Sequence, residues 1–283
     1  MKRVTLLWIV AGLLLFAGCR ERQLDMTLVQ GTAYQEYPIH AISASDVWNL
    51  TIVQDDGPSY IELEYSAFVE EYMHIHYDQD SFYFYLGLHP HLPNNTVLNA
   101  TIHTDCLRSL ILKDAAFAAV EGDFHSPSFM MELEDAASCR GGRFFGDAEI
   151  ELSDASEWVE CSFEGPDCQV DLNDASVFKG CLYINNNLTM TVDDASRFTD
   201  YWGEINHANV KVSDASYLNM ATSWITHMYI EVTDASEATV NVVESLEGKV
   251  HDASKLYYSG NPILNIDCDD ASSIQHVDYP NPN

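Results

Sequence analysis

The sequence predicts an all-β fold, a parallel β-helix (solenoid) built from coils of about 20 residues. Three observations carry this prediction: a recurring tripeptide, fixed apolar positions around it, and an alternation of apolar and polar residues before it. The tripeptide reads Asp-Ala-Ser or Asp-Ala-Ala and begins at Asp114, Asp135, Asp154, Asp174, Asp194, Asp214, Asp234, Asp252 and Asp270. Its nine copies are spaced by 18 to 21 residues, which indicates one structural unit per copy.

Apolar residues occupy the same places in nearly every copy. Two residues before the Asp stand Leu112, Leu133, Leu152, Leu172, Val192, Val212, Val232, Val250 and Cys268. Four residues before it stand Leu110, Met131, Ile150, Val170, Met190, Val210, Ile230, Gly248 and Ile266, a set broken only by Gly248. Four residues after it stand Ala118, Cys139, Trp158, Phe178, Phe198, Leu218, Ala238, Leu256 and Ile274. This period of two predicts a strand with one face in a core on each side of a tight turn.

Such a unit can bury its apolar face only by stacking on its neighbours. Stacked coils advance about 4.8 Å each, so the nine coils would form a rod of roughly 40–45 Å. Nothing recurs at the three-and-four spacing of a helical repeat, and the copies are rich in Val, Thr and Tyr. A coil of about 40 residues with an Asp turn at each end is the open alternative, although odd and even copies show no alternating character.

Residues 27–105 lack the tripeptide and form a separate N-terminal β region, before the β-helix repeats of residues 106–283. Strand-like runs occupy residues 47–54, 60–65, 73–77, 82–88 and 97–104. Turn-forming residues separate them, such as the Asp-Asp-Gly-Pro stretch at 55–58. We expect an antiparallel or irregular β layer that caps the end of the solenoid.

The first 18 residues read as a lipoprotein-type signal peptide. Lys2 and Arg3 precede an apolar run of about a dozen residues, and small residues stand directly before Cys19. This arrangement resembles the bacterial lipobox, in which the Cys thiol is acylated and becomes the new N-terminus, with an ordinary secretory peptide as the alternative. Residues 19–26 would then be a linker. Arg20 after the Cys favours an outer membrane lipoprotein, on the periplasmic or the cell-surface side.

The charge of the chain excludes several partners. It carries 13 Lys+Arg against 44 Asp+Glu, a formal net charge of −31. Phosphate backbones and anionic lipid surfaces would repel it, so we expect no nucleic acid partner and contact with a membrane only through the lipid anchor.

The sequence resembles a known family, the auto-transporter adhesins with a head GIN domain. The similarity lies in a strand, acidic turn and strand between Val47 and Leu86, with the stretches Tyr-Met-His-Ile-His at 72–76 and Phe-Tyr-Phe at 82–84. Ala-Thr-Ile at 100–102 then leads to Leu-Arg-Ser-Leu at 107–110 and the first turn. The resemblance covers nearly the whole mature chain and implies a right-handed, two-sheeted β-helix and, more loosely, adhesion. It implies no catalytic residues.

The column of turn aspartates has two interpretations. In the structural one, each Asp accepts a backbone N–H within its own turn, the following Ala fills a tight inward corner, and the Ser hydroxyl bonds nearby backbone. In the functional one, carboxylates of adjacent coils coordinate Ca²⁺. The structural interpretation is favoured because the glycine-rich nonapeptide of calcium-binding solenoids does not occur. We therefore expect no cofactor and no metal-binding residue, with Ca²⁺ as the open possibility.

Six thiols follow Cys19, namely Cys106, Cys139, Cys161, Cys168, Cys181 and Cys268. Cys161 and Cys181 share a position in consecutive coils, so either a disulfide or a reduced, buried stack is possible. Cys268 stands in an inward column and is expected in the core. His74 and His76 alternate on a strand and could form a metal pair with His89 or His91, although packed or exposed histidines are the simpler interpretation.

Binding is easier to support than catalysis. A lyase acting on uronic acids needs grouped cations, and the repeats hold only scattered ones: Arg108, Lys113, Arg140, Arg143, Lys179, Arg197, Lys211, Lys249 and Lys255. No long loop between coils offers material for a deep pocket. Aromatic residues lie near the bends or on the second side of the coils: Trp158, Tyr183, Tyr201, Trp202, Tyr217, Trp224, Tyr257 and Tyr258.

Trp158 is expected in the core, whereas an outward Trp202 or Trp224 could stack on sugar rings or anchor a protein. The sequence thus favours a non-enzymatic, adhesin-like module that binds a surface glycan or an envelope or host protein. A periplasmic scaffold is the alternative, and a polysaccharide-degrading enzyme is less favoured. The oligomeric state stays open.

Overall fold

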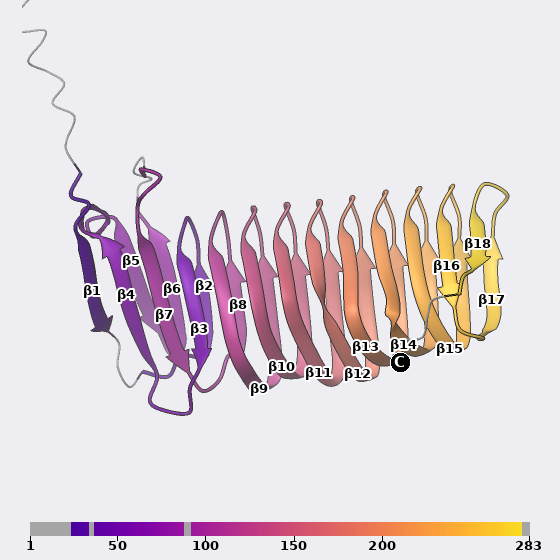
Figure 1. The fold of residues 1–283 in the computed structure, drawn as a ribbon, viewed down its shortest axis with the longest axis horizontal. Coiled ribbons are helices and arrows are strands. Elements are labelled where there is room, and N and C mark those ends of the chain that lie inside the picture. Colours follow the sequence, from indigo (N-terminus) through magenta and orange to yellow (C-terminus); the bar gives the residue numbers. More distant parts are fainter. Residues whose placement is uncertain (1–23, 34–36, 88–91, 279–283) are drawn as a thin grey trace, which may run out of the picture.

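The structure is a computed structural model that describes residues 24–33, 37–87 and 92–278. These residues form one long rod of stacked coils (Figure 1). Strands account for almost all of its regular structure, with one short 3₁₀ turn at Ala67–Val69. No helix in the described part of the chain is long and apolar enough to cross a membrane.

The body of the rod consists of strands that each run through one whole coil. They are β9 (Phe117–Leu133), β10 (Ser138–Leu152), β11 (Glu157–Leu172), β12 (Val177–Val192), β13 (Arg197–Val212), β14 (Tyr217–Val232) and β15 (Glu237–Val250). The shorter β8 (Ser109–Leu112) precedes them and forms only the part of a coil before the first Asp turn. Neighbouring coils pair in parallel at an offset of one repeat, as Leu152 with Leu172 and Leu172 with Val192. This register confirms that each coil contains one tripeptide and about 20 residues, and it excludes a coil of about 40 residues with two tripeptides.

Each coil contributes to two layers, which are joined by narrow loops along one edge of the rod (Figure 1). We call the strand segments after each Asp turn the post-turn layer and those before it the pre-turn layer. The outer side of each layer is a face of the rod, and the inner sides enclose the core. The pairing register between neighbouring coils shifts where a strand bulges or passes from one layer to the other, for example between Val159 and Cys161.

Seven of the nine Asp turns, those from Asp135 to Asp252, have both central residues in the left-handed conformation of a two-residue type I′ turn. Asp154 and Ala155 have φ angles of 52° and 61°, and the N–H of Ser156 donates to the carbonyl of Ser153 at 3.1 Å. The N–H of Ala155 donates to the carbonyl of Asp174 in the next coil at 2.8 Å, so consecutive turns are linked by backbone bonds. The backbone carbonyl before the Asp, and not the Asp carboxylate, closes the turn.

The inward corner belongs to the third residue of the tripeptide. Ala136, Ala155 and the other second-position alanines are exposed, so the expectation that they fill the corner is wrong. The physical reason is the left-handed conformation at both central residues, which turns the Ala side chain outward. Ala137 and Ser156 are buried instead. The Ser156 hydroxyl donates to the carbonyl of Leu133 at 3.0 Å, which confirms its expected bond to backbone.

The three apolar columns form the core, as expected. Trp158, Phe178 and Phe198 stack along the rod with ring centroids 5.8 and 5.2 Å apart, and all three are fully buried. Stacking places equivalent apolar groups in contact, so each coil buries the face that it could not bury alone. Gly248 interrupts one column because its φ is 140° and a Cβ there would lie 1.8 Å from the carbonyl oxygen of Ile230.

The N-terminal end adds coils in an order that differs from the chain order. The strands are β1 (Leu28–Ala33), β2 (Ala41–Ala44), β3 (Asn49–Gln54), β4 (Tyr60–Ser66), β5 (Met73–Asp78), β6 (Ser81–Leu86) and β7 (Leu98–Thr104). The post-turn layer runs β1-β4-β7-β3-β9, and the pre-turn layer runs β5-β6-β2-β8-β9. The β2–β3 pair therefore lies between β6–β7 and the first tripeptide coil.

The β2–β3 pair is a coil without the tripeptide. Asp46 takes the left-handed conformation, with φ of 65°, and its carbonyl accepts the N–H of Ala115 at 2.9 Å. Val47 is exposed and Trp48 is fully buried, as at the second and third tripeptide positions. Outside this pair, β4 and β5 run antiparallel to β7 and β6, and β1 runs antiparallel to β4.

At the C-terminal end of the rod, no further described strand covers the last coil. This end is formed by β16 (Lys255–Ser259), β17 (Ile263–Cys268) and β18 (Ser273–His276), and Ile263 is 78% exposed there. Cys268 is exposed as well, so its expected place in the core is wrong. The core column ends at this coil because no further described coil covers it.

Candidate binding surface

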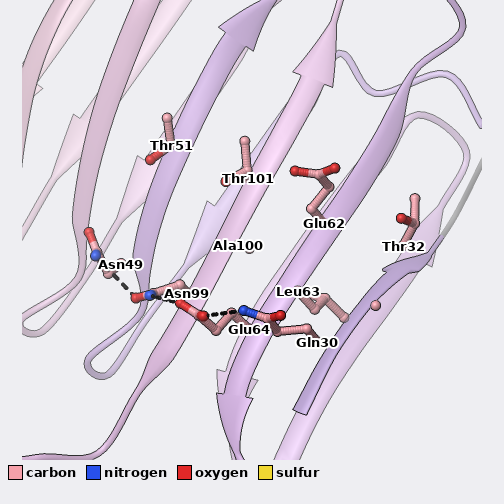
Figure 2. A pocket seen from close by; sticks show the side chains of 11 residues that line it. Gln30, Thr32, Asn49, Thr51, Glu62, Leu63, Glu64, Asn99, Ala100 and Thr101 are labelled. Carbon is pink, nitrogen blue, oxygen red and sulfur yellow. Dashed lines mark hydrogen bonds between the residues drawn. The ribbon is translucent and has the colours of Figure 1, made fainter. Parts of the chain in front are cut away.

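A polar groove opens on the post-turn face near the N-terminal end. It lies across β1, β4, β7 and β3 and has a volume of about 560 Å³. Figure 2 shows its lining, which includes Thr32, Thr51, Glu62 and Thr101. Because strands alternate their side chains, these outward residues form rows across the four strands.

One row is joined by side-chain hydrogen bonds (Figure 2). The Asn49 amide donates to Asn99 at 3.1 Å, and the Asn99 amide donates to Glu64 at 3.0 Å. The Gln30 amide donates to the other oxygen of Glu64. This row presents amides and a carboxylate in fixed positions, which suits a ligand rich in hydroxyl groups.

An aromatic column lies further along the post-turn segments, past the bulge in each coil, and runs toward the C-terminal end. Backbone register places Phe145, Glu164, Tyr183, Glu204 and Trp224 side by side on β10 to β14. Rings and carboxylates therefore alternate from coil to coil, and the rings recur at about 9.6 Å, two strand spacings. Trp224 is 46% exposed. An exposed large ring in a polar surface is typical of a contact site.

A bulge adds two more rings beside this column. Gly180 pairs with Asp200 and Leu182 with Gly203, so Tyr201 and Trp202 both lie opposite a single residue, Cys181. Tyr201 is 48% exposed. The Trp202 ring lies 5.4 Å from the Tyr183 ring of the preceding coil. The bulge thus gathers aromatic surface in the middle of the rod.

Asp200 lies buried beneath this bulge. Its carboxylate accepts a hydrogen bond from the Thr222 hydroxyl at 2.8 Å. Burial raises the pKa of the Asp200 carboxyl, and the hydroxyls of Ser223 and Thr222 act in the opposite direction. The carboxylate connects β13 to β14 at the place where the regular pairing is interrupted.

The aromatic residues singled out in the sequence divide between core and surface. Trp158 is fully buried, as expected, and Trp224 and Tyr201 are exposed. Half-buried positions are taken by Tyr183, Trp202, Tyr217, Tyr257 and Tyr258. The polar groove was not foreseen, because its residues come from strands that carry no repeat signal.

The pre-turn face holds the predicted histidines. His74 stacks on Tyr85 at 4.9 Å and His76 lies 6.1 Å from Tyr83. They are exposed and packed on tyrosines, which is the simpler of the two interpretations. His89 and His91 fall outside the described residues, so the proposed metal pair stays a prediction.

The cysteines are free thiols in the described part of the chain, and Cys161 and Cys181 do not pair. Cys161 is aligned with Gly180, and Cys181 with Ser162, because Glu160 forms a bulge with φ of 60°. The expected equivalence of the two thiols is therefore wrong. Cys161 points into the core, where burial raises its pKa well above the usual range.

Three carboxylates approach one another beside a turn. Oxygens of Asp193, Asp194 and Asp214 lie within 4.8 Å of one another. Asp193 also accepts a hydrogen bond from the Ser213 hydroxyl at 2.7 Å. Carboxylates at this spacing are what the Ca²⁺ interpretation requires, and cation binding here stays a prediction.

The cations of the repeats are spread along the rod and neutralised locally. Lys113 pairs with Glu132 at 2.7 Å and with Glu134 at 2.9 Å. Ion pairs also hold Arg140 to Glu160, Arg143 to Asp123, Lys179 to Glu157, Lys249 to Glu231 and Lys255 to Glu237. This distribution differs from the grouped cations that proton abstraction beside a substrate carboxylate needs, and so favours a role without catalysis.

Comparisons with known proteins agree with this architecture. Two solved structures described as a "putative adhesin", from Parabacteroides distasonis ATCC 8503 and Parabacteroides merdae ATCC 43184, match with TM-scores of 0.61 and 0.59. Their identities are 13% and 10%, and the matches cover 89% of this chain and 98% and 97% of theirs. A "putative lipid binding protein" from P. distasonis matches with a TM-score of 0.60 at 11% identity, covering 90% and 98%.

These likenesses show a shared fold. No curated protein matches the sequence. A family model described as "putative auto-transporter adhesin, head GIN domain" matches residues 39–262, which include the aromatic column and all of the polar groove except its β1 wall. The chain therefore belongs to the auto-transporter adhesin family with a head GIN domain.

Proposed function

We propose that this protein is an outer membrane lipoprotein, anchored through Cys19, that acts as a non-enzymatic, adhesin-like module and binds a neutral surface glycan on its post-turn face. The observation that carries the proposal is the alternation of rings and carboxylates along this face, with Trp224 and Tyr201 nearly half exposed. The lipid anchor rests on the sequence around Cys19, which lies outside the described residues.

The chemistry of the face favours a glycan. Aromatic rings pack against the apolar side of a sugar ring, and carboxylates and amides bind its hydroxyl groups. A linear glycan laid along the rod would meet rings and carboxylates in alternation. The column from Phe145 to Trp224 spans four coil steps, or about 19 Å, which leaves room for several sugar units.

The charge favours a neutral glycan over an acidic one. The net charge of −31 repels uronic acids and sulfated sugars, and Glu164 and Glu204 stand directly in the column. Arg143 packs on the Phe145 ring at 5.1 Å and pairs with Asp123 at 3.2 Å, so its charge is partly neutralised. We therefore expect polyuronates to bind weakly.

The test compares two variants with a matched control. Trp224→Ala and Tyr201→Ala each remove one exposed ring from the post-turn face. Tyr229→Ala removes a ring of similar exposure from the opposite face, in the same strand as Trp224. Binding to soluble dextran, mannan, β-glucan and polygalacturonate would be measured by affinity electrophoresis.

We expect at least one neutral polymer to bind, and each of the first two variants to weaken that binding about five- to tenfold. Tyr229→Ala should bind as the parent does. Failure of every neutral polymer to bind, or equal losses in all three variants, would contradict the proposal. Protease treatment of intact cells then separates surface display from a periplasmic location, because only a displayed rod would be cleaved.

A further inference from the structure

A trough on the pre-turn face has the features of a second binding site. It lies at the N-terminal end, on the opposite side of the rod from the polar groove, and has a volume of about 480 Å³. Ser43 on strand β2 and Ser45, just after it, form the floor, and β6 forms one wall with Tyr83 and Tyr85. Lys113, just after β8, forms the other wall.

The trough exists because β2 carries small outward side chains between two strands that carry larger ones. Ser43 is aligned with Tyr83 on β6 and with Ile111 on β8. Outward side chains of neighbouring strands stand about 4.8 Å apart, so the walls are about 9.6 Å apart at the backbone. A gap of this width between side chains admits a flat ring.

The tyrosine wall is held in place by histidines from β5. His74 stacks on Tyr85, and a Cβ at Gly87 would lie 2.5 Å from the His74 Nε2 atom, so His74 is confined between Gly87 and Tyr85. His76 lies beside Tyr83. Tyr83 and Tyr85 nonetheless keep 40% and 42% of their surface exposed. Restrained, exposed rings lose little entropy when a ligand packs on them.

The lysine wall does not make the trough an anion site. Lys113 Nζ lies 2.7 Å from Glu132 and 2.9 Å from Glu134, and these bonds raise its pKa. Two carboxylates thus compensate one ammonium group. Asp78 adds a further carboxylate at the other end of the trough. The local charge therefore repels acidic ligands and leaves acceptors for hydroxyl groups.

We propose that this trough binds a single neutral pyranose ring, stacked on Tyr83 and Tyr85 and hydrogen-bonded by Ser43, Ser45 and Asp78. The site is independent of the glycan proposed for the post-turn face, since the two surfaces lie on opposite layers. A chain with both sites can bridge two glycan strands, one on each face of the rod.

Nuclear magnetic resonance of the imidazole groups tests the proposal directly. His74 and His76 report on the trough through their contacts with the tyrosines, whereas the indole N–H of Trp224 reports on the post-turn face. The probes are the methyl glycosides of glucose, galactose, mannose and N-acetylglucosamine. We expect one of them to shift the His74 and His76 signals in a saturable way.

Two variants of different character check the location. Tyr85→Ala removes one wall, and Ser43→Ile fills the floor with the side chain that Ile111 already places on the neighbouring strand. Each should weaken the binding seen at the histidines at least about fivefold. Tyr229→Ala, an exposed tyrosine elsewhere on this face, should leave it unchanged.

The possible results separate the two proposals. Histidine signals that no glycoside shifts, or that shift equally in Ser43→Ile, overturn the trough site. If the Trp224 signal responds while those of the histidines do not, the post-turn face binds sugar and the trough does not. The reverse result supports the trough, and the post-turn face, which is proposed for a linear glycan, is then decided by the polymer experiment.

Discussion

The hydroxyl group of Ser196 accepts the backbone N–H of Ser176 in the preceding coil, with a distance of 3.2 Å. The same contact joins Ser216 to Ser236, Ser236 to Ser254 and Ser254 to Ser272. These serines are the third tripeptide residues, and most of them are fully buried. They form a polar ladder along one corner of the core, which explains why a hydroxyl recurs at an inward position.

Ser196→Ala should lower the free energy of unfolding by about 1–2 kcal/mol, since a buried hydrogen bond is lost. A methyl group fits this corner, because Ala116 and Ala137 occupy it in the first two tripeptide coils. The loss would therefore measure hydrogen bonding and not a cavity. Urea unfolding gives the value, with the half-buried Ser138→Ala as the control. A midpoint equal to that of the parent would show that the ladder adds no stability.

Ala175→Gly should raise stability, an unusual direction for a change to glycine. Ala175 has a φ of 62°, and the left-handed conformation costs a residue with a Cβ about 1–2 kcal/mol. Glycine escapes that cost but loses about 0.4–1 kcal/mol through its freer unfolded chain, so a gain of about 0.5–1 kcal/mol remains.

Thermal unfolding of Ala175→Gly checks this expectation. Ala119→Gly, in strand β9, is the matched control and should be destabilising, because glycine weakens a strand. If Ala175→Gly also lowered Tm, the turn geometry described above would be wrong.

The repeats could be predicted from the sequence, and the ends could not. The nine copies of the tripeptide predict the strands, the turns and three core columns, because the same apolar positions recur in nearly every copy. The place of β2–β3 between β6–β7 and β8–β9 depends on long-range pairings of strands that occur once. No periodic signal reports such pairings, although Asp46 and Trp48 repeat the turn pattern in a single copy.

The binding surfaces were predictable only in part. The sequence alone left open whether Trp224 packs in the core or faces outward, and the structure shows it 46% exposed in the register of β13 and β14. Tyr201 and Trp202 lie in a bulge, which places both rings outside the core. In the sequence, the only signal of this bulge is that two adjacent aromatic residues interrupt the alternation of the strand. The trough depends on Ser43 and Ser45 lying beside tyrosines that are about 40 residues away in the chain.

Asp200→Asn should stabilise the protein increasingly as the pH rises. Burial raises the pKa of the Asp200 carboxyl above its unfolded value of about 3.9, so the folded state holds the proton more tightly. The contribution of the protonated Asp200 carboxyl to the free energy of unfolding is fully present below the unfolded pKa, and it is lost as the pH rises through the folded pKa. Asparagine carries no such titration and keeps an acceptor for Thr222.

Urea midpoints of Asp200→Asn and the parent should therefore be close at about pH 4 and diverge toward about pH 8, with the variant more stable. Asp147→Asn, at an exposed carboxylate, controls for the loss of one negative charge. A constant difference across this range, or the same trend in Asp147→Asn, would mean that Asp200 is not the titrating group.

The thiols should react in an order set by their burial. Cys268 is exposed, Cys106 and Cys181 are partly buried, and Cys139, Cys161 and Cys168 are fully buried. Burial raises the pKa of Cys168 to about 12, which leaves almost no thiolate at neutral pH. Alkylation with iodoacetamide, followed by peptide mass analysis, should modify Cys268 first and the buried three only after unfolding. A Cys161–Cys181 disulfide in the purified protein would contradict the register of β11 and β12.

The exposed turn aspartates should make stability depend on ionic strength and not on calcium. Consecutive turns lie about 4.8 Å apart, so their carboxylates repel one another unless salt screens them. The repulsion is visible at Asp214, where a hydrogen bond to Asp193 and the charges of Asp193, Asp234 and Asp194 raise the pKa. Backbone bonds already close most of the turns, and in the Asp214 turn the N–H of Ala215 donates to the carbonyl of Asp234 in the next coil at 2.9 Å, so a bridging cation is not required for the fold.

NaCl and CaCl₂ at equal ionic strength should therefore raise Tm by similar amounts, and Asp214→Asn should raise Tm in low salt and reduce both responses. The alternative outcome is a calcium site at Asp193, Asp194 and Asp214, because their carboxylate oxygens are close enough to share one ion. A rise with CaCl₂ that exceeds the NaCl response, and that Asp214→Asn removes, would establish a calcium site between adjacent coils and would replace the structural interpretation of the Asp column.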